Sequence, residues 1–197
     1  MTAEDPALQA SVDFAFANGF AVGTWASNID YGSDYEGEIE LDLYADYTAT
    51  LSGSLSWSAG LALYTYPGSS GAGKIEPSLE GYLGFAVGSL SGKQWYTHDY
   101  GGLGAGAQYT ELNYAHALTE SWSVTAHAGY SWGEYFEDEL LGGNELFDYS
   151  LGAAFVAGRF TVSGKYVDTD AQGAWLIDRG AFANDARVVV SLSMTAP

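Results

Sequence analysis

Acidic side chains recur at alternate positions of one short stretch. From residue 37 to residue 46 the sequence reads GEIELDLYAD, with carboxylates at Glu38, Glu40, Asp42 and Asp46. Successive side chains of a β-strand point to opposite faces, so these acids share one face and aliphatic residues share the other. Carboxylates that line a confined aqueous space favour cations over anions. The stretch therefore predicts a strand that separates water from an apolar phase.

The whole chain has the same acidic bias. Its 197 residues include 25 Asp and Glu against 6 Lys and Arg, which gives a formal net charge of -19. Nucleic acid is not expected as a partner, because nucleic-acid binding requires a basic surface. Charged residues make up only 16% of the chain, and cysteine is absent. The absence of cysteine excludes zinc–thiolate sites and cysteine nucleophiles.

Alternating hydrophobicity predicts β-strands along almost the entire chain, separated by clusters of Gly, Ser, Asn and Asp. Most of these strands have the roughly 9–11 residues that a tilted transmembrane strand needs. No domain boundary or linker is evident, so residues 1–197 are predicted to form a single domain. The expected strands are eleven: Ala7–Phe16, Phe20–Asp30, Gly37–Leu51, Ser54–Tyr66, Ser78–Gly88, Lys93–Tyr100, Ala107–Leu118, Ser121–Gly133, Leu146–Ala157, Arg159–Asp168 and Ala186–Met194.

The connections between these strands alternate between tight turns and longer loops, as in outer-membrane barrels. In that arrangement the first strand starts on the long-loop side and the last strand ends on the short-turn side. A barrel with an even number of strands needs both ends on one side. The pattern therefore predicts an all-β, antiparallel, up-and-down transmembrane barrel with eleven strands here and about 12 when complete. Residues 1–20 lack the basic segment and apolar core of a signal peptide.

The apolar face of the strands is expected to meet lipid and the polar face to line a lumen. A soluble barrel or sandwich would reverse the two faces, and alternation alone fits both. Strand length, loop alternation and the scarcity of Lys and Arg favour the membrane. Aromatic residues near strand ends are expected to form interfacial girdles: Trp25, Tyr66, Trp95, Tyr130, Trp132, Phe147 and Phe160.

Several segments resemble the TorF-like porin family of small proteobacterial outer-membrane proteins. They span nearly the whole chain and include DPALQASVDFAFANGFAVGTWASNIDYG (5–32), EIELDLYADY (38–47), GLALYTYPG (60–68), LTESWSVTAHAGYS (118–131), GKYVDTD (164–170) and NDARVVVSLS (184–193). The resemblance implies an outer-membrane location. Family members begin with a secretory signal and a strand that ends in an FRG-like turn, and they tend to end in an aromatic residue. This chain has neither the secretory signal nor the strand with the FRG-like turn, and it ends in Met-Thr-Ala-Pro.

The inward face defines the candidate site. If the apolar face meets lipid, the lumen is lined by Asp13, Glu38, Glu40, Asp42, Asp46, Glu80, Glu111 and Asp148, with Lys165, Arg187 and Lys93 as basic partners. The expected function is passive diffusion of small neutral or cationic solutes across the bilayer. The sequence leaves open a closed lumen, in which these acids, Tyr44 and Tyr109 form a stabilising network, and a soluble barrel that binds a ligand inside.

Other chemistry finds little support in the sequence. Acids crowd in EYFEDE (134–139) and at Asp168, Asp170, Asp178 and Asp185, but no calcium-binding loop spacing matches. His98 and His116 lie near strand ends without a convincing Ser and Asn set, and His127 is expected to face the lumen. We therefore predict no enzyme activity, metal or cofactor. The loop 170–185 carries apolar residues that either pack against the barrel rim or fold into the pore.

Overall fold

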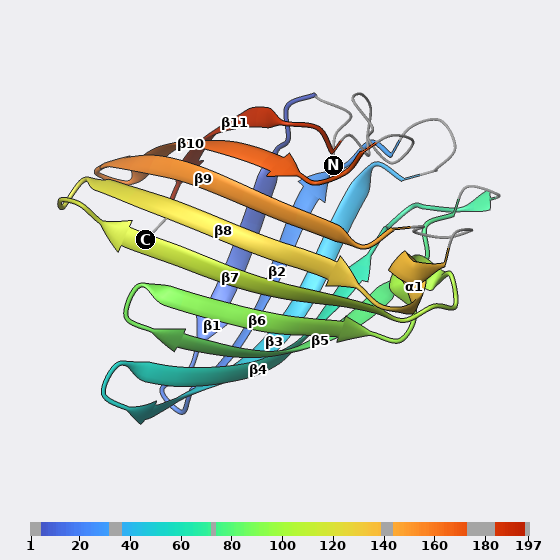
Figure 1. The fold of residues 1–197 in the computed structure, drawn as a ribbon, viewed down its shortest axis with the longest axis horizontal. Coiled ribbons are helices and arrows are strands. Elements are labelled where there is room, and N and C mark those ends of the chain that lie inside the picture. Colours follow the sequence, from blue (N-terminus) through green and yellow to red (C-terminus); the bar gives the residue numbers. More distant parts are fainter. Residues whose placement is uncertain (1–4, 32–36, 72–73, 139–143, 173–183, 196–197) are drawn as a thin grey trace.

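The computed structural model describes residues 5–31, 37–71, 74–138, 144–172 and 184–195. Over these residues the chain forms one antiparallel sheet of eleven strands, in which each strand pairs with the next along the sequence (Figure 1). The strands are β1 (Gln9–Ala15), β2 (Phe20–Asn28), β3 (Ile39–Ser52), β4 (Leu55–Thr65), β5 (Ser78–Val87), β6 (Leu90–Thr97), β7 (Ala107–Ala117), β8 (Trp122–Trp132), β9 (Leu146–Ala157), β10 (Phe160–Thr169) and β11 (Arg187–Met194).

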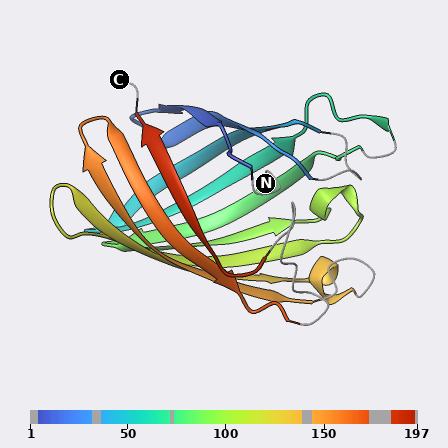
Figure 2. The same ribbon diagram turned by 90° about the horizontal axis from the view of Figure 1, so that it is seen from above.

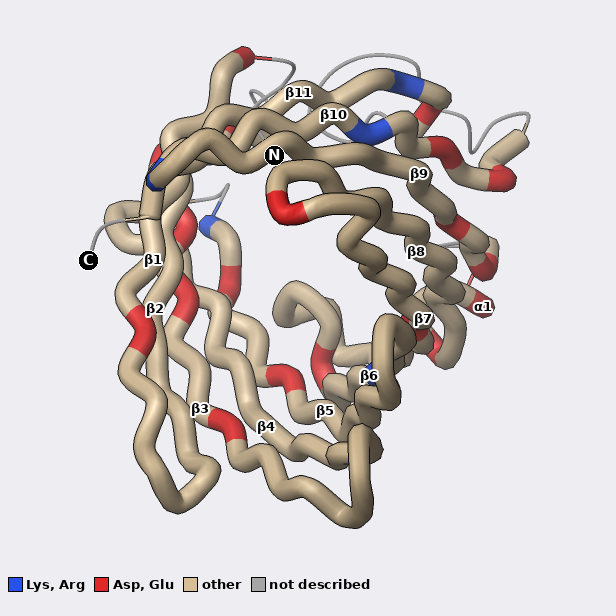
Figure 3. Tube along the Cα trace, turned by 90° about the vertical axis from the view of Figure 1, so that its left-hand side faces the viewer, with Lys and Arg blue, Asp and Glu red and all other residues tan. Residues whose placement is uncertain are grey.

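The sheet curls into a barrel, with β1 and β11 as its edge strands (Figures 2 and 3). Among the described residues, no hydrogen-bonded register joins these two strands. The longer connections gather at one end of the barrel. Two short helical segments lie there, η2 (Tyr100–Gly102) and α1 (Glu134–Glu137) (Figure 1). The predicted up-and-down arrangement of eleven strands is confirmed, and the expected twelfth strand stays a prediction.

The two faces of the sheet differ in polarity as the alternation predicts. Aliphatic side chains point outward and are exposed: Leu61 is 56% exposed, Leu83 67% and Val190 72%. The inward face carries hydroxyl, amide and charged groups that contact one another across strands. No large side chain in the described part of the chain is fully buried. The described part of the barrel therefore lacks the apolar interior that holds a soluble barrel together.

One strand begins earlier than its sequence indicates. We expected a turn at residues 90–92 and a strand over Lys93–Tyr100, but β6 starts at Leu90, which pairs with Val87. The turn lies at Gly88, which adopts a φ of 58°. Glycine has little steric cost in this left-handed region. Gly92 instead lies within the strand, between Phe85 and Leu112, where neighbouring side chains leave no room for a Cβ.

Three of the aromatics expected at the membrane interfaces lie on the inward face, and one of them is Tyr66, whose hydroxyl reaches Glu40. Trp25 is directly opposite Asp42 in the register between β2 and β3. Trp95 donates its indole N–H to Glu111. Paired residues in an antiparallel ladder project from the same face, so both rings belong to the lumen wall. No helix among the described residues is long and apolar enough to span a membrane.

Candidate functional site

An acidic strip runs along the inward face of β3 and reaches β5. We define it as Glu40, Asp42 and Asp46 on β3 together with Glu80 on β5. Glu40 and Glu80 lie close enough to Asp42 for both carboxylates to repel its charge. Oδ1 of Asp42 is buried and has no hydrogen-bond partner among the described residues. Among the described residues, no lysine or arginine forms an ion pair with the carboxylates of the strip.

Tyrosines cover the long-loop end of the acidic strip. The Tyr66 hydroxyl, just after β4, lies 3.5 Å from Oε1 of Glu40. Burial, followed by the charge of Glu40, raises the pKa of Tyr31. Burial also raises the pKa of Tyr66, with further contributions from Tyr31 and Glu40. Both phenols therefore stay neutral near physiological pH and add no negative charge to this end of the strip.

A hydrogen bond joins the edge strand β1 to β3, beside the acidic strip. Asp13 on β1 accepts a hydrogen bond from the Tyr44 hydroxyl on β3. The two strands are not neighbours, since β2 lies between them. The ring of Tyr44 crosses β2 at Gly23, where a Cβ would clash with both Tyr44 and Asp13. A glycine on the middle strand thus allows this inward hydrogen bond across three strands.

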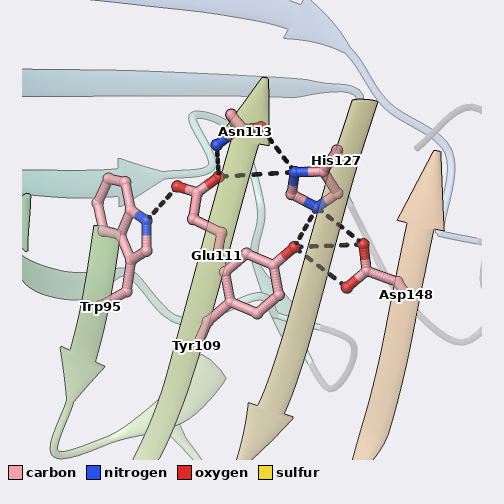
Figure 4. A network of polar contacts seen from close by, with 6 residues as sticks. All are labelled: Trp95, Tyr109, Glu111, Asn113, His127 and Asp148. Atoms are coloured by element: carbon pink, nitrogen blue, oxygen red, sulfur yellow. Dashed lines mark hydrogen bonds and ion pairs between the residues drawn. The ribbon is translucent and has the colours of Figure 1, made fainter. Parts of the chain in front are cut away.

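The opposite wall carries a more highly connected group, shown in Figure 4, which we call the His127 network. Its hydrogen bonds cross four adjacent strands. Trp95 Nε1 donates to Glu111 at 2.8 Å, and Asn113 Nδ2 donates to the other oxygen of Glu111 at 2.8 Å. The ring of His127 lies 2.7 Å from Asn113 Oδ1 and 3.0 Å from Asp148 Oδ1. Tyr109 completes the network, because its hydroxyl lies 2.9 Å from His127 Nε2 and 3.1 Å from Asp148 Oδ2.

Strand register explains why these residues meet. Glu111 on β7 is opposite Gly129 on β8, and Gly129 is opposite Asp148 on β9. A Cβ at Gly129 would clash with the Tyr109 hydroxyl and with Asp148. The glycine therefore leaves the space in which Tyr109 reaches Asp148. His127, two residues earlier on β8, points to the same face because side chains alternate.

Both ring nitrogens of His127 face oxygen acceptors. Nδ1 faces Asn113 Oδ1, whose amide nitrogen is already committed to Glu111. Nε2 faces a carboxylate oxygen of Asp148. Each ring nitrogen therefore lies within hydrogen-bond distance of an oxygen that can accept from it. The network thus fixes the orientation of the His127 ring on this wall.

A single lysine interacts with aromatic faces between the two walls. The Nζ of Lys93 lies 4.0 Å from the ring centroid of Tyr82 and 4.8 Å from that of Trp95. The two rings are themselves 4.6 Å apart. An ammonium above aromatic faces is attracted by their negative quadrupoles. The lumen wall thus already contains one site where a cation is held by rings.

The remaining predicted site residues lie at different places. Glu38 precedes β3 and is exposed at the long-loop end, so it is not part of the strand that we predicted over Gly37–Leu51. Lys165 on β10 is opposite Gly152, on the inward face. Arg187, the first residue of β11, forms an ion pair with Asp185. These two basic side chains therefore lie on the β10–β11 side, away from the acidic strip on β3 and β5.

Sequence comparison places the chain in a known family. Residues 1–196 match a family described as "Bacterial protein of unknown function (Gcw_chp)". The chain belongs to the Gcw_chp family. A comparison with curated proteins gives no match. The resemblance to TorF-like porins stays a prediction.

The Gcw_chp barrel also resembles a solved structure, titled "Crystal structure of a Pseudomonas aeruginosa FadL homologue", with a TM-score of 0.52. The sequences are 14% identical, and the match covers 93% of this chain and 64% of that chain. At this identity the likeness shows the fold alone. It agrees with the barrel architecture of the eleven strands.

Several residues of the inward face that form the site were missed by sequence reasoning. Asn113 and Tyr82 had no assigned role, and Trp95 was expected at an interface. A signal for Trp95 was present, because it has the same parity as Lys93 within one strand and so shares its face. The cross-strand contacts of Asn113 depend on register, which a single sequence does not specify.

The other candidate sites have little structural support. The described residues contain no group of three or more acidic or histidine side chains positioned to hold a metal ion. Residue 139, residue 178 and the apolar part of the loop 170–185 lie outside the described residues. His116 lies at the short-turn end, where its Nδ1 is 3.5 Å from the hydroxyl of Ser89.

Proposed function

We propose that this protein is a passive channel of the outer membrane that admits small neutral or cationic solutes. The outward apolar face supports a location in lipid. Barrels can cross lipid because their backbone hydrogen bonds are made between strands. The barrel fold shared with the FadL homologue is consistent with this location. The proposal assigns a transport role, with no chemical reaction.

The observation that carries the proposal is the imbalance of charge on the inward face. Glu40, Asp42 and Glu80 lie together without a neighbouring lysine or arginine among the described residues. The basic inward residues Lys93, Lys165 and Arg187 lie on other strands. A pathway lined in this way attracts cations, and it opposes anions by like-charge repulsion.

Planar-bilayer recording of the refolded chain tests the proposal. Under a KCl gradient, stepwise currents with a reversal potential on the cation side are expected. Glu40→Gln combined with Asp42→Asn should move the reversal potential toward zero, because two inward charges are removed. Glu120→Gln is the control for loss of an acid outside the lumen, since Glu120 lies exposed in the turn between β7 and β8.

Each outcome of the recording has a defined meaning. Anion preference, or cation preference that the double variant leaves unchanged, would remove the acidic strip from the pathway. A barrel that shows heat-dependent gel migration but conducts no current would support a closed, structural lumen. A chain that folds and stays monodisperse without detergent would contradict the membrane location itself.

A further inference from the structure

A cavity lies inside the barrel at the long-loop end. Its volume is about 320 Å³, which is at the small end of the range for ligand pockets. The wall comes from five strands and from both short helical segments. The residues that carry the argument are Glu80, Trp95, Tyr100, Tyr109, Phe136 and Asp148.

We propose that this cavity binds small organic ammonium ions, held by Glu80 and Asp148 and enclosed by the rings of Trp95, Tyr100, Tyr109 and Phe136. This proposal rests on the proposed function in placing the site at the mouth of the pathway, and it specifies the class of solute that the mouth selects. Aromatic faces and carboxylates together are the groups that recognise an ammonium whose substituents are apolar.

The aromatic walls are held in place by their own contacts. Trp95 is oriented by the hydrogen bond from its indole to Glu111, and Tyr109 by the bonds to His127 and Asp148. Tyr100 in η2 packs against Phe136 in α1, with ring centroids 5.8 Å apart. Rings that are already positioned lose little conformational freedom when a ligand binds.

The charge of the cavity favours a positive ligand. Among the described residues, neither Glu80 nor Asp148 forms an ion pair with a lysine or arginine. Glu80 accepts a hydrogen bond from Tyr64, and Asp148 is shared with Tyr109 and His127. Glu80 therefore has no basic partner among the described residues, and it is the carboxylate of the cavity with the fewest contacts.

Lys93 shows that one of the cavity rings, Trp95, attracts an ammonium. Its Nζ lies over Trp95, which also lines the cavity, at 4.8 Å from the ring centroid. An inorganic ion is less well matched, because hard cations require several converging oxygen ligands. No such cluster is present among the described residues. The combination of aromatic rings with the carboxylates of Glu80 and Asp148 suits an alkylated ammonium better.

Calorimetric titration of the refolded barrel in detergent micelles tests the proposal, with choline as the probe. Its neutral isostere 3,3-dimethyl-1-butanol has the same shape without the charge. The Kd of choline is expected to be about tenfold lower than that of the isostere. Glu80→Gln should weaken choline binding by about tenfold, and Glu120→Gln should leave it unchanged.

Trp95→Leu provides a second test of the walls, because it removes a ring while keeping an apolar side chain. It should weaken choline binding severalfold. Equal binding of choline and the isostere, binding unaffected by Glu80→Gln and Trp95→Leu, or no binding to a folded barrel would overturn the proposal. A cation-selective channel that does not bind choline would refute only this inference. Choline binding by a barrel that conducts no current would refute only the proposed channel function.

Discussion

Gly129 provides the sharpest test of the inward network. It is the residue of β8 that lies between Glu111 and Asp148, and a Cβ there would clash with the Tyr109 hydroxyl and with Asp148. The replacement Gly129→Ala should therefore displace Tyr109 from Asp148. The hydrogen bond at 3.1 Å between those groups would be lost, and the contacts of both with His127 would be weakened.

The expected cost follows from these contacts. Each hydrogen bond contributes about 0.5–1.5 kcal/mol net, and exposure to lumen water lowers that figure. Replacing a strand glycine by alanine returns roughly 0.5–1 kcal/mol of backbone entropy. Relative to a glycine-to-alanine replacement elsewhere in a strand, where the entropy gain is the same, we therefore expect Gly129→Ala to reduce the free energy of unfolding by about 1–2 kcal/mol.

Urea unfolding of the refolded barrel in detergent, followed by tryptophan fluorescence, measures this change. Gly164→Ala is the matched control, because Gly164 also lies within a strand and a Cβ there would meet nothing within 4 Å. The free energy of unfolding of the control variant should be equal to or higher than that of the original protein. If Gly129→Ala is as stable as Gly164→Ala, the crowding around Gly129 is refuted.

Two further predictions concern the outward face and Lys93. Leu61→Arg, at the middle of β4, should cost about 2–4 kcal/mol of unfolding free energy in lipid, whereas Leu51→Arg beside a turn should cost about 0–1 kcal/mol. Equal effects in a lipid-vesicle unfolding assay would contradict a lipid-facing Leu61. Lys93→Gln removes the ammonium over Tyr82 and Trp95. It should shift the reversal potential further toward cations, and an unchanged potential would place Lys93 outside the pathway.

The strand pattern was predictable because it depends on local alternation. A period of two assigns every side chain of a strand to one of two faces, and the exposed aliphatic face of β3 and β4 follows from that period alone. That Asp42 and Asp46 share the other face follows in the same way, whereas the folded barrel shows that this face is the inward one. The start of β6 was wrong because both Gly88 and Gly92 are turn-forming residues, and only the paired backbone shows which one adopts a positive φ.

Which residues come into contact in the site depended on tertiary structure. A single sequence shows that Glu111, His127 and Asp148 share a face, but their contacts depend on the register of three strands. The cavity depends on tertiary structure even more strongly, because Tyr100 and Phe136 line it from two separate loops at the end of the barrel.

The sequence by itself therefore determined which side chains of each strand share a face and that one of the two faces is acidic. Both are set by residue type and by alternation along each strand. Only the tertiary structure decided which acids have partners and where an aromatic cavity remains, because those features arise from contacts between distant strands and loops.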